Sequence, residues 1–463
     1  MKRNLRFYFA LLFARLTALA VRLAGRQGTS MPGSWAIILC PDFLGRMPKP
    51  KTIIGVTGTN GKTSTANLIT DILEENGVSC FSNRFGSNVN TGIVSALLQN
   101  SRFWGQPKHD VAVLEIDERS APRIFPYLQP DMLVCTNLCR DAMDRNAHID
   151  FLVGLLNGNI GDGVKLIVNG DDLITAHLKP GNSRVTFGIA ELPADSEARP
   201  NLVRDIIVCP ECGEKLEYGF LRYNHIGRAR CPGCGWGSPE HIDYEITAVE
   251  GETMCVTVQT PAGEEVYRLP GRGITDLYNI LAAIALLREF GLSCQEVAGS
   301  MKAAELVKSR YRTEKAGGWE IIMQLAKGQS PIASSRVFDS IAGQGEDCAV
   351  ILLNYDHHDQ EHSTENIAWI YEADYEFLRA DCVKQIVAGG NRCYDYALRA
   401  RIAGIPAERI DCALKPENVV KLVHLNVVRR IYILYAVYTQ WKAEEIKDLL
   451  VRRILAAEKG ETA

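Results

Sequence analysis

The sequence predicts an α/β protein with two α/β units, the first of which carries a small metal-binding insertion. Three observations support this fold class. A strand, a glycine-rich turn and a helix follow one another over residues 51–73. Strand and helix patterns then alternate to about residue 190, as in a parallel sheet. A second series of buried strands begins after about residue 305, and a length of 463 residues fits two or three domains.

Composition is that of an ordinary globular protein, with 46% apolar and 23% charged residues. The net charge of −4 provides no basic field for nucleic acid, so we expect no nucleic-acid partner. Fourteen cysteines in this length do not make a disulfide-dense secreted domain. Ten of them are scattered, often within apolar runs, and are expected to be reduced; the other four are spaced for a metal.

The first 50 residues contain an apolar segment, Leu5–Ala24, which follows two basic residues. Arg15 and Arg22 interrupt it, and an arginine in the middle of a membrane-spanning helix costs about 2.5–3.5 kcal/mol. The two arginines are seven residues apart and share a helix face, which indicates an amphipathic helix. We expect it to pack on its own domain. An interfacial helix near a membrane and a cleaved signal peptide are the alternatives.

The stretch Gly55–Thr63, GVTGTNGKT, is typical of a phosphate-binding loop between the strand at Lys51–Ile54 and the helix at Ser64–Leu73. Glycines let backbone N–H groups close around phosphate oxygens, and a helix N-terminus favours anions. Lys62 would reach the β- and γ-phosphates, and the Thr63 hydroxyl would hold Mg²⁺. The alternative is a glycine-rich turn that binds nothing. The residues expected to bind ATP here are Gly58, Thr59, Asn60, Gly61, Lys62, Thr63 and Ser64.

Val56 occupies the position at which the standard phosphate-loop pattern has glycine.

Further elements of this unit are predicted from buried runs and helical periodicity. They are strands at Val78–Ser82, Val111–Ile116, Met132–Asn137 and Lys165–Val168, and a helix at Thr91–Gln99.

Glu115 lies at the end of its strand, just as the phosphate loop lies at the end of its own, and open α/β sheets bind ligands at this edge. It is therefore our candidate Mg²⁺ ligand or water-orienting group opposite Thr63. The alternative is an ordinary surface acid. Asp141, Asp144 and Asp171 are weaker candidates, which we expect to cap helices or form ion pairs.

Two C-x₂-C pairs eighteen residues apart, each followed by glycine, fit a Cys₄ zinc ribbon at about residues 205–240. The ribbon contains few basic residues, so we expect a closed structural site rather than a nucleic-acid reader. His225 has the wrong spacing to be needed as a ligand. The expected zinc ligands are Cys209, Cys212, Cys231 and Cys234.

Short strands with a turn at residues 261–263 follow over Tyr244–Arg268, and a helix follows over Asp276–Phe290. The second unit has three predicted strands, Cys348–Asn354, Val383–Ala388 and Arg430–Tyr438. Residues 355–362 contain three histidines and three acids, which fits a solvated loop as well as a metal site.

Several motifs together resemble the Mur ligase superfamily. They are Thr57–Thr63 with its displaced glycine, Leu114–Glu118, Thr136–Leu138, Asn169–Asp172 and Tyr278–Ala283. More narrowly, the chain resembles the MurT family, over nearly its whole length. The most specific stretches are Gly28–Gly33, Arg140–Arg145, the Cys₄ ribbon and Gly390–Arg399.

The resemblance implies a Mur ligase central P-loop domain at 51–304 with the inserted Cys₄ zinc ribbon, followed by a Rossmann-like α/β C-terminal domain at 305–463. About 50 residues precede the phosphate loop, so we expect no N-terminal UDP-binding domain like that of the longer Mur ligases. MurT-like proteins lack that domain.

The resemblance also implies an ATP-dependent carbon–nitrogen ligase of peptidoglycan synthesis with ATP, Mg²⁺ and Zn²⁺ as cofactors. Its family amidates the D-glutamate α-carboxylate of the lipid II stem peptide through an acyl phosphate. Ammonia comes from a GatD-like glutaminase subunit, with which a heterodimer is expected. The implied location is the cytoplasm, or the periphery of the inner face of the cell membrane, where lipid II lies.

In this resemblance Lys62 and Glu115 are catalytic, and Asn279 belongs to the nucleotide cleft. Asp359, with Asp356 behind it, is the candidate to complete the partner's Cys–His pair. Two functional alternatives stay open: a Mur-type ligase that joins another carboxylate and amine without a glutaminase, and a non-catalytic ATP- and zinc-binding interaction protein.

The chain departs from its family in places. Asp141–Ala142 stands where other Mur ligases have Asp-His, so one metal ligand is missing, as in MurT-like chains. Lys327 is followed by Gly328–Pro331 instead of Asn-Pro-Ala-Gly. Gln360 replaces the glycine after Asp359, although Asn354 and Trp369 match.

Overall fold

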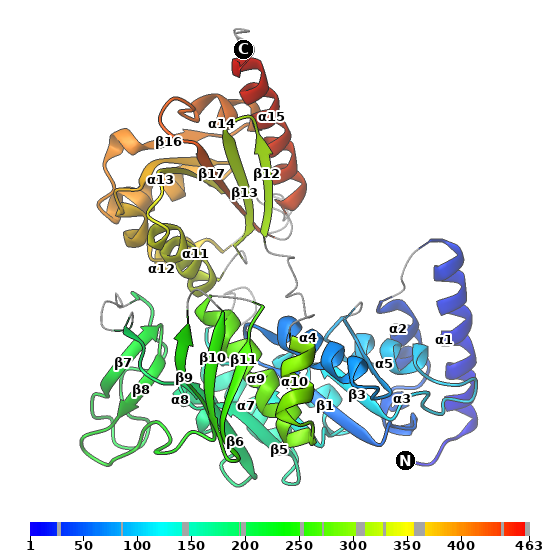
Figure 1. Cartoon of the computed structure of the whole chain (residues 1–463). Coiled ribbons are helices and arrows are strands. Elements are labelled where there is room, and N and C mark those ends of the chain that lie inside the picture. Colours follow the sequence, from blue (N-terminus) through cyan, green and yellow to red (C-terminus); the bar gives the residue numbers. More distant parts are fainter. Residues whose placement is uncertain are drawn as a thin grey trace. The chain divides into compact units, whose positions relative to one another are not determined.

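The computed structural model describes most of the chain, in two compact units (Figure 1). Unit 1 comprises 1–139, 148–198 and 206–306, and unit 2 comprises 140–147, 199–205 and 307–463. The described residues are 1–25, 29–84, 87–140, 148–193, 195, 201–250, 254–270, 273–301, 311–326, 330–355, 366–436 and 439–458. Two short segments, 140–147 and 199–205, thus belong to unit 2, in addition to the expected C-terminal part of the chain.

Unit 1 is organised around a nine-stranded sheet with the order β11-β10-β9-β6-β5-β4-β1-β3-β2. The strands from β2 to β9 in this order pair in parallel, whereas β9, β10 and β11 pair antiparallel. The strands are β1 Thr52–Thr57, β2 Cys80–Ser82, β3 Val111–Glu115, β4 Met132–Cys135, β5 Lys165–Asn169, β6 Arg184–Ile189, β9 Tyr244–Glu250, β10 Cys255–Thr260 and β11 Gly263–Arg268. The predicted strands are confirmed, and β6 is an addition.

Helices cover both faces of this sheet, because its strands are apolar on both sides. Ile54 and Val56 of β1 pack with α4 and α9 on one face, while Ile53 packs with α5 and the N-terminal helices on the other. The helices of unit 1 are α1 Leu5–Leu23, α2 Met31–Leu39, α3 Phe43–Arg46, α4 Lys62–Glu75, α5 Asn90–Gln99, α6 Ala121–Ile124, α7 Ile149–Asn159, α8 Leu173–Ala176, α9 Ile274–Phe290 and α10 Cys294–Met301.

A separate antiparallel hairpin, β7 Glu217–Tyr223 and β8 Ile226–Arg230, is inserted between β6 and β9. It is part of the predicted ribbon. A small apolar cluster around Leu173, Leu216 and Ala229 joins it to α8, so the ribbon rests on the main domain.

Unit 2 contains a six-stranded sheet with the order β12-β13-β17-β14-β15-β16, in which β12 and β13 pair antiparallel and the others in parallel. The strands are β12 Tyr311–Ala316, β13 Trp319–Leu325, β14 Cys348–Leu353, β15 Val383–Gly389, β16 Ile410–Ala413 and β17 Arg430–Tyr435. The helices are α11 Pro331–Gly343, α12 Ala368–Glu372, α13 Cys393–Ile402, α14 Pro416–Leu422 and α15 Gln440–Glu458. Short 3₁₀ helices of unit 2 lie at Tyr375–Arg379 and Ala407–Arg409, and one of unit 1 lies at Glu118–Ser120.

The N-terminal helix α1 packs on its own domain as expected, through Phe7, Ala10, Leu11 and Ala14. Its exposed face differs from the amphipathic expectation, because large apolar side chains point outward. Arg15 does not disrupt the helix, since its guanidinium donates to Ser101 Oγ at 3.0 Å beside it. Over the part of the chain that the structure describes, no helix has both the length and the apolar content needed to span a bilayer.

Candidate active site

The turn between β1 and α4 takes a conformation that only glycine adopts readily at two positions. Gly58 has φ +124° and Gly61 has φ +87°. A Cβ at Gly58 would lie 2.3 Å from Thr136 Oγ1, and one at Gly61 would lie 2.0 Å from Asn279 Oδ1. Both glycines are therefore required by backbone conformation and by close approach. The glycine absent at Val56 is not needed there, because Val56 is a buried residue of β1.

The loop is fastened to the end of β4. Thr59 N donates to Asn137 O at 2.8 Å, and the Asn137 amide exchanges hydrogen bonds of 3.1 and 2.9 Å with the backbone of Asn60. The Thr136 hydroxyl donates to Asn60 O at 2.6 Å. The Asn137 side chain thus satisfies the backbone N–H and C=O of Asn60 where the pairing of β1 with β4 has ended. In this way it holds the loop in its conformation.

Lys62 is the first residue of α4, and its side chain is 12% exposed. Its Nζ lies 3.0 Å from Glu118 Oε1 and also donates to Gly58 O. Burial alone would lower the pKa of Lys62, but nearby carboxylates, Glu118 foremost, raise it above its usual value. Burial raises the pKa of Glu118, and the Lys62 charge opposes that shift. The lysine is thus held as a cation inside the phosphate loop.

Glu118 is the residue that the sequence interpretation missed. It lies in the motif Leu114–Glu118, but only Glu115 received a role there. A 3₁₀ turn over Glu118–Ser120 follows β3 and carries the Glu118 side chain back toward the loop. The sequence feature that could have indicated this role is its position three residues after Glu115, because a single helical turn after the strand brings both acids to the same sheet edge.

Glu115 ends β3 and lies beside the start of α4. Its Oε2 accepts a 2.8 Å hydrogen bond from the Thr63 hydroxyl, and its Oε1 accepts one of 2.9 Å from Asn88 Nδ2. Thr63 is exposed and Glu115 is half-buried. A hydroxyl and a carboxylate in contact at an exposed edge are hard oxygen donors of the kind that Mg²⁺ prefers, so these residues fit a magnesium site.

Asn279 reaches the same place from α9, although it lies more than 200 residues along the chain. Its side chain lies directly against Gly61, and its backbone carbonyl accepts from Thr65 Oγ1 at 3.4 Å. The structure therefore brings together the loop residues Gly58–Ser64, Glu115 and Asn279. Their roles toward a nucleotide stay predictions.

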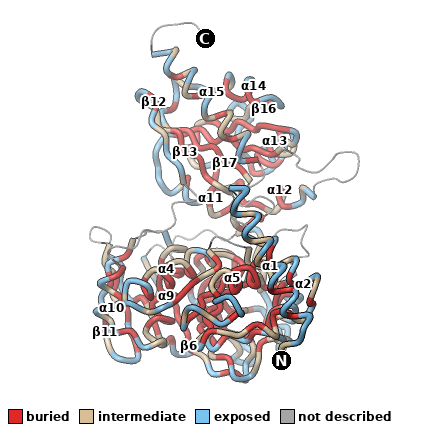
Figure 2. The backbone as a smooth tube through the Cα atoms, turned by 90° about the vertical axis from the view of Figure 1, so that its right-hand side faces the viewer, coloured by how far each residue is buried: buried red, intermediate tan, exposed pale blue. Residues whose placement is uncertain are grey.

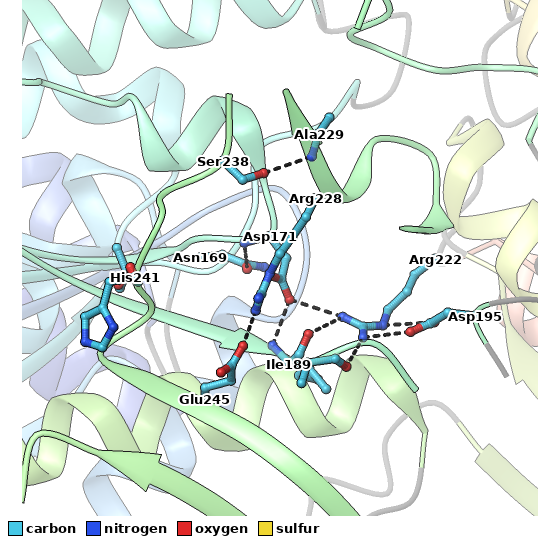
Figure 3. Close-up of polar contacts among 12 residues, drawn as sticks. Asn169, Asp171, Ile189, Asp195, Arg222, Arg228, Ala229, Ser238, His241 and Glu245 are labelled. Carbon is cyan, nitrogen blue, oxygen red and sulfur yellow. Dashed lines mark hydrogen bonds and ion pairs between the residues drawn. The ribbon is translucent and has the colours of Figure 1, made fainter. Parts of the chain in front are cut away.

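A second group of acids lies at the ends of β5 and β6, and these acids are already paired (Figure 3). Asp171 is fully buried; Arg222 Nη1 lies 3.1 Å from its Oδ2, and Arg228 Nε lies 3.0 Å from its Oδ1. The Tyr278 hydroxyl and Ile189 N also donate to it, at 2.7 and 2.8 Å. The expectation that Asp171 forms ion pairs is confirmed.

Asp172 continues this arrangement toward the phosphate loop. Its carboxylate accepts from Ile174 N as the N-cap of α8, from Leu138 N at 2.7 Å, and forms a 2.9 Å contact with His225 Nε2. His225 is fully buried in this contact and lies outside the group formed by the four ribbon cysteines. Arg222, His225 and Arg228 all belong to the ribbon hairpin, which therefore supplies the partners of both acids.

The four ribbon cysteines come together as predicted. Their sulfur atoms lie within 4.8 Å of one another, and the Cys209–Cys234 and Cys212–Cys231 pairs are 3.5 and 3.4 Å apart. Gly213 and Gly235 both have φ +77°, and their N–H groups donate to the carbonyls of Cys209 and Cys231. Two matching knuckles with four thiols fit a tetrahedral zinc ion.

Hydrogen bonds to backbone N–H groups prepare one of these thiols for a metal. Burial opposes ionisation of Cys231, but the N–H groups of Cys234 and Gly233 help to lower its pKa to about 7. The thiolate is the form that binds zinc.

In unit 2, Asp356, Asp359 and Lys327 lie outside the described residues, as do Asp141 and Asp144. Asn354, which follows β14, is buried. Arg140 Nη1 donates to both carboxylate oxygens of Glu372, at 3.1 and 3.2 Å. Asp374 accepts from Asn201 Nδ2 at 2.8 Å and from Leu202 N at 2.6 Å. These contacts explain why the short segments around 140 and 201–205 belong to unit 2.

Comparison with known proteins agrees with this division. The family described as "Mur ligase middle domain" matches residues 56–205, and that described as "MurT ligase C-terminal" matches residues 328–440. A protein of Staphylococcus aureus (strain COL) is 32% identical over 87% of this chain and 89% of its own length. It is named lipid II isoglutaminyl synthase (glutamine-hydrolyzing) subunit MurT. This chain belongs to the MurT family.

A second MurT protein, from Streptococcus pneumoniae (strain ATCC BAA-255 / R6), is 31% identical over 97% of this chain and 98% of its own length. Among solved structures, a pseudomurein peptide ligase type C from Methanothermus fervidus covers 88% of this chain and 80% of its own, with a TM-score of 0.64 and 20% identity. The latter likeness concerns the fold. As a member of the MurT family, the chain is an ATP-dependent ligase of the Mur superfamily.

Proposed function

We propose that this chain is the synthetase subunit of a lipid II isoglutaminyl synthase. It would convert the α-carboxylate of D-glutamate in the lipid II stem peptide to an amide, with ATP as the energy source and ammonia as the nitrogen donor. The names of the MurT relatives support the reaction class. The observation that carries the proposal is the contact of Thr63 with Glu115 beside Lys62, at the mouth of the phosphate loop.

The proposed reaction has two steps. A carboxylate oxygen of D-glutamate attacks the γ-phosphorus of ATP, and ADP leaves. Ammonia then attacks the acyl carbon, inorganic phosphate leaves, and the nitrogen loses a proton. A Mg²⁺ ion bound by Thr63 and Glu115 would neutralise phosphate charge during the first step.

This chain's own residues have definable tasks in the proposed reaction. Backbone N–H groups of Gly58–Thr63 hold the phosphates, and Lys62 places its ammonium against the β- and γ-phosphates. Glu118 keeps Lys62 charged and oriented within the loop. Asn279 orients the nucleotide from α9, and Cys209, Cys212, Cys231 and Cys234 of the ribbon would hold a structural Zn²⁺.

Ammonia would come from a GatD-like glutaminase partner, which hydrolyses glutamine to glutamate. Asp359, with Asp356 as the second candidate, would complete the Cys–His pair of that partner. The acceptor is lipid-linked, so the subunit would work in the cytoplasm at the inner face of the membrane.

Reconstitution with lipid II, ATP and Mg²⁺ tests the proposal. We expect amide formation, measured by mass spectrometry of the stem peptide, with glutamine plus the glutaminase or with a free ammonium salt. Lys62→Ala and Glu115→Ala should each abolish both amide formation and ADP release. Lys51→Ala, which removes an exposed lysine just before β1, is the matched control and should be unaffected.

Unchanged turnover in the Lys62 and Glu115 variants would contradict the proposal. Amide formation with ammonium alone, but never with glutamine and the glutaminase, would favour a ligase that works without that partner. ATP binding without ADP release in the presence of lipid II and ammonium would indicate a non-catalytic binding protein.

A further inference from the structure

The outer face of α1 carries a continuous stripe of large apolar side chains. Residues spaced by three or four positions lie on one helix face. The six residues of this outer stripe are between 49% and 89% exposed, while Phe7, Ala10, Leu11 and Ala14 on the opposite face are buried. Figure 2 shows the exposed positions along α1. The stripe consists of Leu5, Phe9, Leu12, Leu16, Leu19 and Leu23.

Neighbouring aromatic residues widen the stripe into a patch. Phe13 of α1 contacts Trp35 of α2 with ring centres 5.3 Å apart, and Tyr8 contacts Trp104 at 6.2 Å. Phe103 packs edge-on against Trp104. Of these, Trp35, Phe103 and Trp104 are at least 40% exposed. Tryptophan, tyrosine and phenylalanine beside leucine are the residues that interfacial helices place at the boundary of headgroups and acyl chains.

The charged side chains of the N-terminal segment that carries the stripe are all basic. Residues 1–41 contain no aspartate or glutamate. Arg6, Arg22 and Arg102 are exposed at the patch. Long basic side chains can lie along apolar surface and keep their charge in the headgroup layer, where anionic lipids attract them. The basic residues of this segment are Lys2, Arg3, Arg6, Arg15, Arg22 and Arg26.

We propose that this patch, the outer stripe of α1 with Trp35, Phe103 and Trp104, docks the protein on the surface of an anionic lipid bilayer. The inner face of α1 stays packed on α2 and α3, so the helix lies along the membrane surface rather than across it. A symmetric contact between two copies of this chain is disfavoured, because it would bring the basic rims of both patches together. Docking agrees with the lipid-linked acceptor proposed above but does not depend on it.

Co-sedimentation of the full-length protein with sucrose-loaded vesicles tests the proposal without any substrate. We expect binding to vesicles of phosphatidylglycerol and phosphatidylcholine that is at least tenfold tighter than binding to phosphatidylcholine alone, and that weakens as salt is raised. The variant Leu12→Glu/Leu16→Glu should lose at least tenfold in vesicle binding. The matched control is Leu398→Glu/Ile402→Glu, two helical residues with the same spacing and similar exposure in α13, which should bind as the wild type does.

Equal vesicle binding by the wild type and Leu12→Glu/Leu16→Glu would overturn the proposal, as would a wild type that does not bind. Light scattering without lipid gives a further check: a wild-type dimer that the variant dissociates would identify the patch as a contact between copies and overturn lipid docking. Lipid docking would also be overturned if the protein bound no vesicles and only this variant failed to form a complex with the glutaminase. Circular dichroism establishes that the variant is folded.

Amidation of lipid II in detergent separates the two proposals. We expect Leu12→Glu/Leu16→Glu to keep its turnover in detergent, where no bilayer is needed. Loss of turnover there would contradict a purely docking role for the patch, whereas a wild type that binds vesicles but never amidates would contradict only the proposed function.

Discussion

The two groups of acids at the carboxyl edge of the unit 1 sheet have opposite surroundings. Asp171, after β5, is enclosed and contacts two arginines and a tyrosine hydroxyl. Glu115, at the end of β3, lies half-buried and accepts hydrogen bonds from the neutral groups Thr63 and Asn88. Within the described ranges, Glu115 forms no ion pair.

Position at a sheet edge therefore does not by itself give an acid a ligand-binding role. An acid whose charge is matched by buried arginines stabilises the fold, because removing either partner strands a charge. An acid satisfied by neutral donors keeps its negative charge available for a cation. The inserted ribbon makes this distinction, since its hairpin supplies Arg222 and Arg228 to one end of the sheet.

Metal removal from the ribbon should give the largest effect, because the ribbon hairpin supplies the arginines that pair with Asp171. Zinc contributes about 10 kcal/mol or more to the folding of small zinc-finger peptides. Chelation, and Cys231→Ser, should therefore make residues 206–240 sensitive to limited proteolysis and lower the melting temperature of unit 1. Zinc content measured by a colorimetric chelator follows the loss, which should be faster at lower pH because protons compete for the thiolates.

Cys255→Ser is the control for the ribbon, because Cys255 lies outside the metal cluster. It should retain zinc and resist proteolysis as the wild type does. A ribbon that stays protected after complete zinc loss would show that the apolar contacts and ion pairs of the hairpin suffice to hold it.

Asp171→Ala should have the next largest effect. It leaves two arginines without their buried carboxylate, which typically lowers the free energy of unfolding by about 3–5 kcal/mol. Urea unfolding of unit 1 measures the change. Asp162→Ala is the control, because that carboxylate is 94% exposed and its ion pair with Lys179 is screened by solvent. Similar unfolding midpoints for both variants would remove Asp171 from the structural group.

Glu115→Gln should have the smallest effect on stability and a selective effect on chemistry. The amide keeps the shape of the carboxylate but carries no charge for Mg²⁺, so ADP release should fall at least about a hundredfold, equivalent to about 2.7 kcal/mol. Titration with Mg²⁺ should show a weaker response. Asp110→Asn, just before the amino end of β3, removes only a surface pair with Lys51 and should retain activity. A large loss of stability in Glu115→Gln would make Glu115 resemble Asp171.

Much of the fold was predictable because local signals and burial agree. The glycine-rich turn, the apolar runs and the paired cysteines specify β1, β3, β4, β14 and the ribbon knuckles from short stretches of chain. Strands β6, β12, β13 and β16 were not predicted, and neither was the role of Glu118. A single strand of mixed composition has no strong pattern, and the Glu118 contact depends on a 3₁₀ turn that folds the side chain back onto Lys62.

The sequence alone determined the chemistry on offer: a phosphate loop, an acid at the next strand end, four cysteines with zinc spacing, and an apolar N-terminal segment with arginines. These are properties of neighbouring residues, so spacing reveals them. Tertiary structure decided which acid is free, because Arg222 and Arg228 reach Asp171 from more than 50 residues along the chain, and which helix face is exposed. Such outcomes depend on packing between distant elements, which no local pattern records.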